Sequence, residues 1–430
     1  MGIGALPNFV RPFHHSSLLI PNSSLLFTPR GHQTMKLNPT QPIIGIIAEW
    51  NPFHLGHAAM IRNIQNQYPE ATFIAAMSGS FVQRGEPALF DKWTRARWAL
   101  ESGIHIIFEL PALYALQSAD LFASYGVTLL SHAGVTHLAF STESLTKEEL
   151  QDAATWATSD EYVSVFHEAL GKGISYGQAA YEAMAHHSPY LAEELSKPNN
   201  LLGFRYVETI IRHHYPMDIL VNHRDMDHNI SATTARSELL RNKETILLPP
   251  SAIEEAKQLM EIGAYTDPTR YEDSCLLCSR QLTLEDLAQS GLFREGLEYK
   301  WYKETSAPTY TAMLDNIKSK RYLYSRLKRI GAQLLLSGTH SPSPFSHLLP
   351  PGYLKLLGLR QEKSRMLKQC TLPVYPSTAK AMRDLPPAYQ AMLSLDIQAT
   401  NLCAYCQAAP AMRKGREDFY RSPVIVRSEK

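Results

Sequence analysis

The sequence lacks long hydrophobic segments, because its 430 residues contain no uninterrupted apolar run of about 18 residues, the length that a membrane-spanning helix needs. Cysteine is scarce as well, and five cysteines in a chain of this length do not make a disulfide framework. Both absences predict a protein of the reducing cytoplasm with no membrane partner. No protein partner is evident from the sequence.

A strong net charge is also missing. The 42 Lys and Arg residues are balanced by 41 Asp and Glu, so the formal charge is +1 and the pI is about 7.7. Any nucleic acid would therefore need a local basic patch. With 44% hydrophobic and 19% charged residues, the composition is typical of a globular protein of roughly two to three domains.

Acidic residues are absent from the N-terminal segment, where the first Asp or Glu is Glu49. The composition resembles a transit peptide, but the segment has no clear amphipathic period and no cleavage signal. We interpret residues 1–40 as a disordered leader, or as translation from a start codon upstream of Met35. The leader is excluded from the predicted fold.

Short runs rich in β-branched residues recur about every 30 residues after the leader, with helix-like segments between them. Buried parallel strands have this pattern, because crossover helices cover both faces of their sheet. The sequence therefore predicts an α/β fold with a Rossmann-like, doubly wound parallel sheet, whose ligands bind beyond the carboxyl ends of the strands. The predicted strands are 43–48, 72–77, 104–110 and 136–141, and the predicted helices are 57–68, 91–103 and 119–134.

The rest of the chain is predicted to be mainly helical. Residues 146–214 form a helical insertion, 217–224 a last strand of the same sheet, and 247–252 a Pro-containing boundary. Beyond it we expect amphipathic helices joined by Pro-rich connectors. The predicted domains are an α/β domain at 41–245, a mainly helical domain at 246–410 and a loose basic tail at 411–430.

The first strand runs directly into the motif HLGH, which contains His54 and His57 three residues apart. We expect the helix to begin between His54 and Gly56. Near its start this spacing places both imidazoles on one face, where free backbone N–H groups and the helix dipole favour an anion. Gly56 lets a ligand approach the backbone. The motif predicts a phosphate clamp, and the alternative is a helix-capping pair without a ligand.

The motif resembles that of the HxGH nucleotidyltransferase superfamily, whose members break ATP between its α and β phosphates. A second segment, ISATTAR at 230–236, is similar to the late Ser/Thr-rich motif of that superfamily. The resemblance implies that Ser231, Thr233 and Arg236 hold the triphosphate at a helix N-terminus. Alone the segment is a weak signal, since any helix can be capped in this way.

A narrower resemblance extends from about Ile44 to Leu402, to the bacterial tRNA(Met) cytidine acetate ligase family. It is carried by AEWNPFHLGH, MSGSFVQRGEPALFDKWTRARWALESG, IFELPALYALQSADLFA, KPNNLLGFRYV and SLDIQATNL. The family activates acetate with ATP as acetyl-adenylate and transfers the acetyl group to N4 of the wobble cytidine in elongator tRNA(Met). This resemblance implies ATP and Mg²⁺ as cofactors, acetate and elongator tRNA(Met) as partners, an ATP-binding domain at 41–245 and an RNA-binding domain at 246–410.

The resemblance also assigns the site. His54, His57 and Arg236 are the expected catalytic residues, because they can stabilise charge on the phosphates. The expected ATP-binding residues are Ile47, Ala48, Glu49, Trp50, Asn51, Pro52, Phe53, His54, Leu55, Gly56, His57, Met60, Ser141, Asn200, Ser231, Thr233 and Arg236. Two positions depart from the family pattern, which has Gly in place of Ser141 and often His in place of Met60.

The segment 78–92 is expected to be a polar loop at the carboxyl edge of the sheet, where such loops handle second substrates. We hypothesise that Arg84 and Glu86 hold acetate or the incoming cytosine. A solvated connection with an Arg–Glu pair is the alternative.

Residues 315–329 form a basic segment with two tyrosines, Tyr322 and Tyr324, which we expect on a helix. The family likeness favours contact with tRNA, in which aromatic rings stack on bases. An ordinary solvated cationic face is the alternative. The predicted RNA-binding residues are Lys318, Lys320, Arg321, Tyr322, Arg326, Lys328 and Arg329.

Four cysteines form two CxxC pairs, Cys275 with Cys278 and Cys403 with Cys406. They could close a tetrahedral zinc site if the fold brings the pairs together, but their separation is unlike that of a zinc ribbon. We favour unlinked thiols and predict no metal site built from protein ligands. The histidine pairs at 186–187 and 213–214 lack carboxylates at matching spacing, which favours ordinary surface histidines.

Two other functions remain open at this stage. A nucleotidyltransferase acting on a small molecule would use the same histidine motif, although the helical half and the basic segment argue against it. A non-catalytic RNA-binding protein with a relict nucleotide site is the third possibility, to which Ser141 gives slight support.

Overall fold

The computed structural model describes residues 41–223, 231–319, 321–338 and 342–427. The predicted leader, Lys320 of the basic segment and the first residue of ISATTAR lie outside the described residues. All of these described residues belong to one compact unit.

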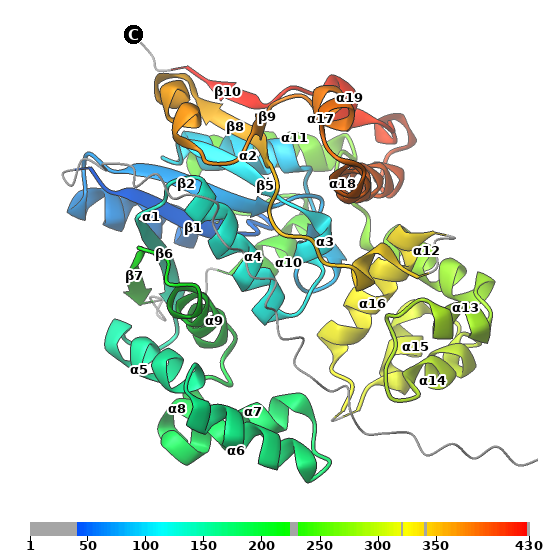
Figure 1. Ribbon diagram of the computed structural model, residues 1–430. Helices are drawn as coiled ribbons and strands as arrows, with labels where there is room; N and C mark the ends of the chain where they lie inside the picture. The colour runs from blue at the N-terminus through cyan, green and yellow to red at the C-terminus, as the bar shows by residue number, and fades with distance from the viewer. Residues whose placement is uncertain (1–40, 224–230, 320, 339–341, 428–430) are drawn as a thin grey trace, which may run out of the picture. The chain divides into compact units, whose positions relative to one another are not determined.

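A sheet of eight strands in the described part of the chain organises the fold (Figure 1). Its path is β10 (Val424–Val426), β8 (Leu354–Arg360), β5 (Ile106–Leu110), β2 (Thr72–Ser78), β1 (Ile43–Ala48), β6 (His137–Thr142) and β7 (Asp218–His223), while β9 (Val374–Tyr375) pairs with β8. The strands from β5 to β7 are parallel, in register through pairs such as Ile44 with Phe73. All five predicted strands are therefore confirmed, within two residues at each end.

Helices cover both faces of the sheet, because successive strand residues enter two different cores. Phe73, Ala75 and Met77 of β2 pack into a core shared with the two helices α1 (Leu55–Gln67) and α2 (Lys92–Glu101). Ile74 and Ala76 enter the opposite core, with α4 (Ala119–His132) and α9 (Pro198–Arg212). The predicted doubly wound α/β fold is confirmed.

The strand β8 was not predicted. Its sequence, LKLLGLR, lies in a region where we expected helices, and its leucines are good helix formers. The segment forms a strand because of its tertiary surroundings. It pairs antiparallel with β5, through pairs such as Ile106 with Leu359, and it is buried on both faces. The C-terminal half thus contributes strands to the N-terminal sheet, although it is mainly helical as expected.

Two groups of helices extend from the sheet. The first lies between β6 and β7 and ends in α9. It includes α5 (Lys147–Ala157), α6 (Asp160–Gly171), α7 (Tyr176–His187) and α8 (Pro189–Glu194). The second follows α10 (Ala232–Asn242) and comprises α11 (Pro250–Glu261), α12 (Pro268–Gln281), α13 (Leu284–Gln289), α14 (Leu297–Glu304), α15 (Tyr310–Ile317) and α16 (Tyr324–Ser337). The chain then returns to the sheet through β8.

The last helices pack near the carboxyl end of β5. They are α17 (Thr378–Asp384), α18 (Pro387–Tyr405) and α19 (Glu417–Tyr420), and α18 contacts the short helix α3 (Ala112–Ala115). The predicted domain bounds at residues 245 and 410 stay a prediction.

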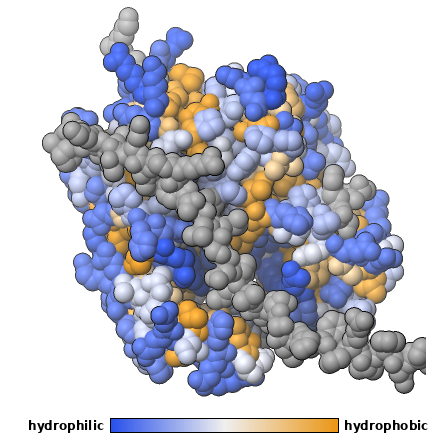
Figure 2. Space-filling model, viewed as in Figure 1, coloured by the Kyte–Doolittle hydropathy of each residue, from blue (hydrophilic) through white to orange (hydrophobic). Residues whose placement is uncertain are grey.

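On the face shown in Figure 2, hydrophobic side chains occur in separate patches between hydrophilic ones. Among the described residues, no helix is long and apolar enough to cross a membrane.

Candidate active site

The two histidines of the motif cap the first turn of α1. The helix begins at Leu55, and its N-cap is His54, which is 6% exposed. The N–H of Gly56 donates to Nδ1 of His54 at 3.1 Å, and the N–H of His54 donates to Nδ1 of His57 at 3.2 Å. Their rings stack with centroids 3.7 Å apart. The predicted helix start and shared face are confirmed, and the two histidines form a capping pair, whereas their role as phosphate ligands stays a prediction.

This capping fixes the tautomers of both imidazoles. A neutral imidazole whose Nδ1 accepts a hydrogen bond carries its proton on Nε2. His54 and His57 therefore each have a donor at Nε2, beside the N-terminus of α1. Stacked N–H donors at a helix N-terminus suit an anion such as a phosphate.

Arg236 of α10 joins the second motif to the first. Its Nη1 donates to the carbonyl oxygen of Asn51 at 2.5 Å, and its Nη2 donates to Thr233 Oγ1 at 3.4 Å. Burial lowers the pKa of Arg236, and the carboxylates of Glu86 and Glu49 oppose that shift. Asn51, which precedes the histidine motif, and Arg236 of the second motif are 185 positions apart in the chain and meet through this hydrogen bond.

Ser231 is the N-cap of α10. Its Oγ accepts the N–H of Thr234 at 3.1 Å and lies 2.8 Å from Thr234 Oγ1. The Ser/Thr-rich segment is therefore a capped helix N-terminus, as the sequence predicted. Thr233 is exposed.

Ser141 and Met60, the two departures from the family pattern, contact each other. The Ser141 hydroxyl, near the end of β6, donates to the thioether sulfur of Met60 at 3.3 Å. Met60 lies one turn beyond His57 on α1, so the contact joins the histidine helix to β6.

Asn200, a predicted ATP ligand, is fully buried, and protein groups use its amide. Its Oδ1 accepts the N–H of Glu143 at 2.9 Å, and its Nδ2 donates to Ser144 Oγ at 3.0 Å and to Glu194. The side chain thus fixes the loop that follows β6. This arrangement favours an indirect role for Asn200, in positioning that loop.

The other residues of the predicted ATP-binding stretch form the base of the histidine loop. Trp50 and Phe53 are buried and pack edge to face with ring centroids 5.3 Å apart. The N–H of Leu55 donates to the Leu247 carbonyl at 2.8 Å. Half-buried Ile47 contacts α4 at Gly126, and Ala48 and Pro52 are buried.

Glu49 connects the end of β1 to the segment 78–92. Its Oε1 accepts the N–H of Gln83 at 2.7 Å. Burial raises the pKa of Glu49, against the lowering effects of the Gln83 N–H and of Arg84, Arg236 and Arg95.

Arg95 was missed by the sequence analysis. This fully buried side chain donates to the carbonyls of Glu49 at 2.6 Å, Ser78 at 3.1 Å and Phe90 at 3.1 Å, and also to that of Gly79. Burial lowers its pKa to about 10, so it stays charged. Arg95 thereby joins the carboxyl ends of β1 and β2. Its sequence signals were its place in the predicted helix at 91–103 and in the segment 77–103 that carries the family resemblance.

Arg84 and Glu86 lie at the tip of a small hairpin, β3 (Phe81–Val82) with β4 (Glu86–Pro87). Arg84 is exposed, whereas the Glu86 carboxylate forms an ion pair with Lys328 of α16. Gly85 between them has φ +81° and would place a Cβ against the backbone of α16. The hairpin is therefore held against the basic segment. The hypothesis that Arg84 and Glu86 hold acetate or the incoming cytosine stays a prediction.

The basic segment is not one helix, which corrects our expectation. It runs from α15 through the non-helical residues Lys318 and Arg321 into α16, which begins at Tyr324. Tyr322 is buried, and its hydroxyl donates to the Glu295 carbonyl at 3.2 Å. In this arrangement Tyr322 supports the surface and does not offer its ring to a base.

Several predicted RNA-binding cations already have protein partners. Arg321 pairs with Glu295 at 2.7 Å, and Arg326 lies over the Tyr322 ring at 5.7 Å. Lys318 and Lys328 lie over Tyr324, at 6.0 and 5.1 Å. Arg329 donates to the Gln83 carbonyl at 3.4 Å, and burial lowers its pKa to about 10.

The described residues contain no group of three or more His, Cys, Asp or Glu side chains that could hold a metal ion. The four cysteines of the CxxC pairs are free thiols. Burial raises the pKa of Cys275 to about 12 and that of Cys406 to about 11. This geometry gives the zinc alternative no support.

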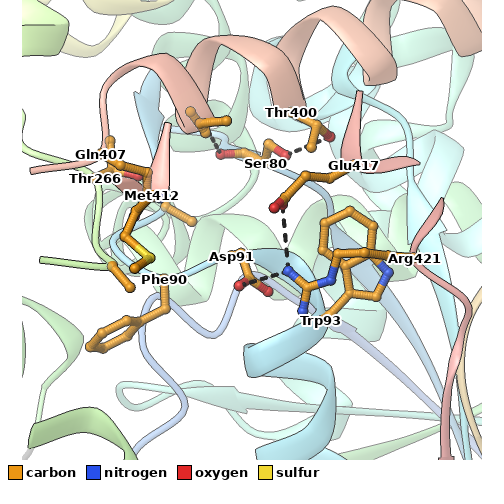
Figure 3. A pocket seen from close by; sticks show the side chains of 14 residues that line it. Ser80, Phe90, Asp91, Trp93, Thr266, Thr400, Gln407, Met412, Glu417 and Arg421 are labelled. Carbon is orange, nitrogen blue, oxygen red and sulfur yellow. Dashed lines mark hydrogen bonds and ion pairs between the residues drawn. The ribbon is translucent and has the colours of Figure 1, made fainter. Parts of the chain in front are cut away.

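A cavity of about 140 Å³ lies beside the segment 80–93, under α18 and the C-terminal segment. Figure 3 shows the Arg421 guanidinium between Asp91 and Glu417, 3.1 and 3.4 Å away, and beside Trp93. The hydroxyl groups of Ser80 and Thr400 form a hydrogen bond of 3.1 Å. The charged groups of the cavity are thus satisfied by one another. None of its lining residues, all in the described chain, is a predicted ATP ligand.

The fold and the histidine clamp are those of a nucleotidyl transferase, and a family model described as HIGH Nucleotidyl Transferase matches residues 42–418. Two bacterial relatives are both named tRNA(Met) cytidine acetate ligase. The one from Geobacillus sp. is 34% identical over 81% of this chain and 91% of its own length. The one from Syntrophomonas wolfei is 32% identical over 89% and 99%. The chain therefore belongs to the tRNA(Met) cytidine acetate ligase family, a family of ligases.

Two solved structures also match this chain along most of its length. The crystal structure of Thermotoga maritima TmcAL bound with alpha-thio ATP matches with a TM-score of 0.83 at 28% identity, over 90% of this chain and all of that one. The apo form of the same protein matches with a TM-score of 0.82. The expected family and fold class are confirmed, whereas the predicted site residues stay a prediction.

Proposed function

We propose that this protein uses acetate and ATP to form N4-acetylcytidine at the wobble position of elongator tRNA(Met). The observation that carries the proposal is the arrangement at the start of α1. There His54 and His57 each have an N–H donor at Nε2, and Arg236 donates to the nearby carbonyl of Asn51. Family membership supports the choice of acetate and tRNA(Met) as substrates.

The donors of the site suit a triphosphate. When an acetate oxygen attacks the α-phosphate, negative charge grows on that phosphate and on the departing pyrophosphate. Imidazole N–H groups, the first backbone N–H groups of α1 and the Arg236 guanidinium can stabilise this charge. The protein needs no nucleophile, because positioning supplies much of the rate enhancement.

Magnesium fits the reaction as a partner of the phosphates. In the described chain no carboxylate cluster could hold the ion alone, and Mg²⁺ commonly binds substrate phosphates with few protein ligands. Bound to the phosphate oxygens, Mg²⁺ would neutralise part of the negative charge of the triphosphate. The cytoplasmic location remains a prediction.

Carbon-labelled acetate tests the proposal. The purified protein is incubated with ATP, magnesium and labelled acetate, with and without elongator tRNA(Met), and label in the RNA is counted. We expect label without coenzyme A, its loss in His54→Ala, and its retention in His167→Ala, which alters an exposed histidine on α6.

Two results would favour the other functions. Pyrophosphate release that depends on a metabolite other than acetate, with no label in the RNA, would favour a small-molecule nucleotidyltransferase. RNA binding without pyrophosphate release would favour a non-catalytic protein.

A further inference from the structure

Glu49 is held on one side only. Gln83 bonds its Oε1, and Arg95 bonds its backbone carbonyl, so both the loop and the carboxylate are fixed. Within the described ranges no donor bonds the second carboxylate oxygen, Oε2, and this atom is not among the fully enclosed polar atoms without partners. The residue is half-buried. Five residues before His54, a half-buried glutamate thus has one carboxylate oxygen fixed by the Gln83 N–H and a second that accepts no hydrogen bond from the described residues.

Acceptor atoms of Glu86, Glu143 and the two motif histidines are already used, whereas Oε2 of Glu109, which has no hydrogen-bond partner among the described residues, is buried in β5. Glu86 is paired with Lys328. Glu143 accepts hydrogen bonds on both oxygens, from the side chain and N–H of Asn199 at 2.8 and 3.1 Å and from the N–H of Asn200 at 2.8 Å. The Nδ1 atoms of the two motif histidines accept backbone N–H groups, which leaves their Nε2 atoms as donors.

The charges around Glu49 come from four elements. Arg84 lies on the hairpin, Arg95 on α2 and Arg236 on α10, and Tyr206 of α9 is close enough for the carboxylate to influence its ionisation. Burial raises the pKa of Glu49 above that of a solvated glutamate, and the three arginines oppose this shift. A basic, oriented carboxylate suits proton transfer.

We propose that Glu49 is the general base of acetyl transfer, an inference that rests on the proposed function. The N4 lone pair of cytidine attacks the acetyl carbonyl, the new N–C bond forms, and the bond between the acetyl carbon and the phosphate oxygen breaks. AMP leaves with that electron pair. The amide nitrogen of the product keeps one hydrogen, so one N4 proton moves to Oε2 of Glu49 and is then released to water.

Glu49→Gln separates the two half-reactions. The amide oxygen of glutamine can still accept the Gln83 N–H, but it cannot take up a proton. We expect single-turnover acetyl transfer to slow by about 100-fold or more, and by a much larger factor than acetate-dependent ATP–pyrophosphate exchange. The acid limb of the wild-type pH profile for transfer should disappear. Glu49→Asp should recover part of the rate of acetyl transfer. The control is Glu70→Gln, which changes an exposed glutamate just before the first residue of β2.

Three results would overturn the inference. Transfer by Glu49→Gln at the wild-type rate, with an unchanged pH profile, would show that Glu49 is not the base. Equal losses of exchange and transfer would make it part of the adenylate site instead. Wild-type protein without exchange would refute the proposed function itself. If Glu49→Gln fails to fold, the pH profile of Glu49→Asp decides, because an unshifted acid limb would contradict the inference.

Discussion

The hydroxyl of Ser141 donates a hydrogen bond to the sulfur of Met60, 3.3 Å away and 81 positions earlier in the chain. Both residues depart from the pattern that the family resemblance implied, and the contact makes them one packing unit between β6 and α1. The departures therefore bear on how the histidine helix is supported.

The first prediction concerns this pair. Because the hydroxyl is turned toward Met60, Ser141→Ala should leave ATP affinity within about threefold of wild type, as measured by calorimetric titration. Ser141→Ala and Met60→Leu should show a coupling of about 0.5 kcal/mol in the free energy of unfolding. A tenfold or larger loss of ATP affinity in Ser141→Ala would mean that the hydroxyl binds the nucleotide directly.

The second prediction concerns Arg236, whose guanidinium bonds the Asn51 carbonyl and Thr233. Lysine keeps the charge but has no planar fork, so it cannot hold the loop and a phosphate together. Arg236→Lys should weaken ATP binding roughly tenfold, since a charged hydrogen bond contributes about 1.5 kcal/mol or more. Arg241→Lys, at the exposed end of α10, is the matched control. Equal affinity in both variants would mean that charge alone matters.

The third prediction concerns the ion pair between Glu86 and Lys328, whose side chains are 30% and 24% exposed. A pair of this kind contributes about 1 kcal/mol. Glu86→Lys and Lys328→Glu should each displace the hairpin and lower both the free energy of unfolding and RNA acetylation. The double reversal should restore part of each quantity. No recovery in the double variant would show that the two residues act independently.

The fourth prediction concerns pH and His105. Its Nδ1 accepts the N–H of Phe73 at 2.9 Å, and burial, with Lys363 and Arg360 nearby, lowers its pKa to about 4. Between these two pKa values, His105 is protonated in the unfolded chain and neutral in the folded chain, so acid favours unfolding. This contribution to stability is complete above about pH 6.5 and is lost as the pH falls toward 4.

The variant His105→Asn tests this account, since an amide oxygen can accept the Phe73 N–H without titrating. Urea unfolding at several pH values should show a smaller loss of stability for His105→Asn than for wild type between pH 6.5 and 4. Equal slopes would place the pH dependence elsewhere.

The fifth prediction concerns a buried triad. The Lys92 ammonium lies 2.6 Å from Glu109 and 2.8 Å from Asp418, and these side chains are at most 2% exposed. Lys92→Met leaves two buried carboxylates without this cation and should cost about 3–5 kcal/mol in the free energy of unfolding. Lys92→Met combined with Glu109→Gln and Asp418→Asn should lose less. An equal or larger loss in the triple variant would contradict this explanation.

Much of the fold follows from sequence, because local pattern and global structure agree there. The five parallel strands are short segments rich in apolar residues, and the start of α1 at Leu55 follows from a capping residue, His54, after a strand end. The strand β8 did not follow, since LKLLGLR satisfies helix and strand patterns alike and only the vacant edge of β5 decides between them.

The site was predictable to the extent that its motifs are local. HLGH and the ATTAR helix could be found without the fold, but the bond that joins them through Asn51 could not. The roles of Arg95 and Gln83 depend on main-chain atoms from distant segments, which leave no signature in residue spacing. Burial of Tyr322 was equally invisible, because exposure depends on the helices packed around it.

The late position of β8 also has a consequence for biosynthesis. A ribosome that has delivered residues 41–245 has made every residue of the proposed phosphate site, yet β5 still presents an unpaired edge. That edge is covered only when residues 354–360 emerge and pair with it. If β1 to β7 fold before those residues are made, the edge of β5 is a template for strand addition during that interval.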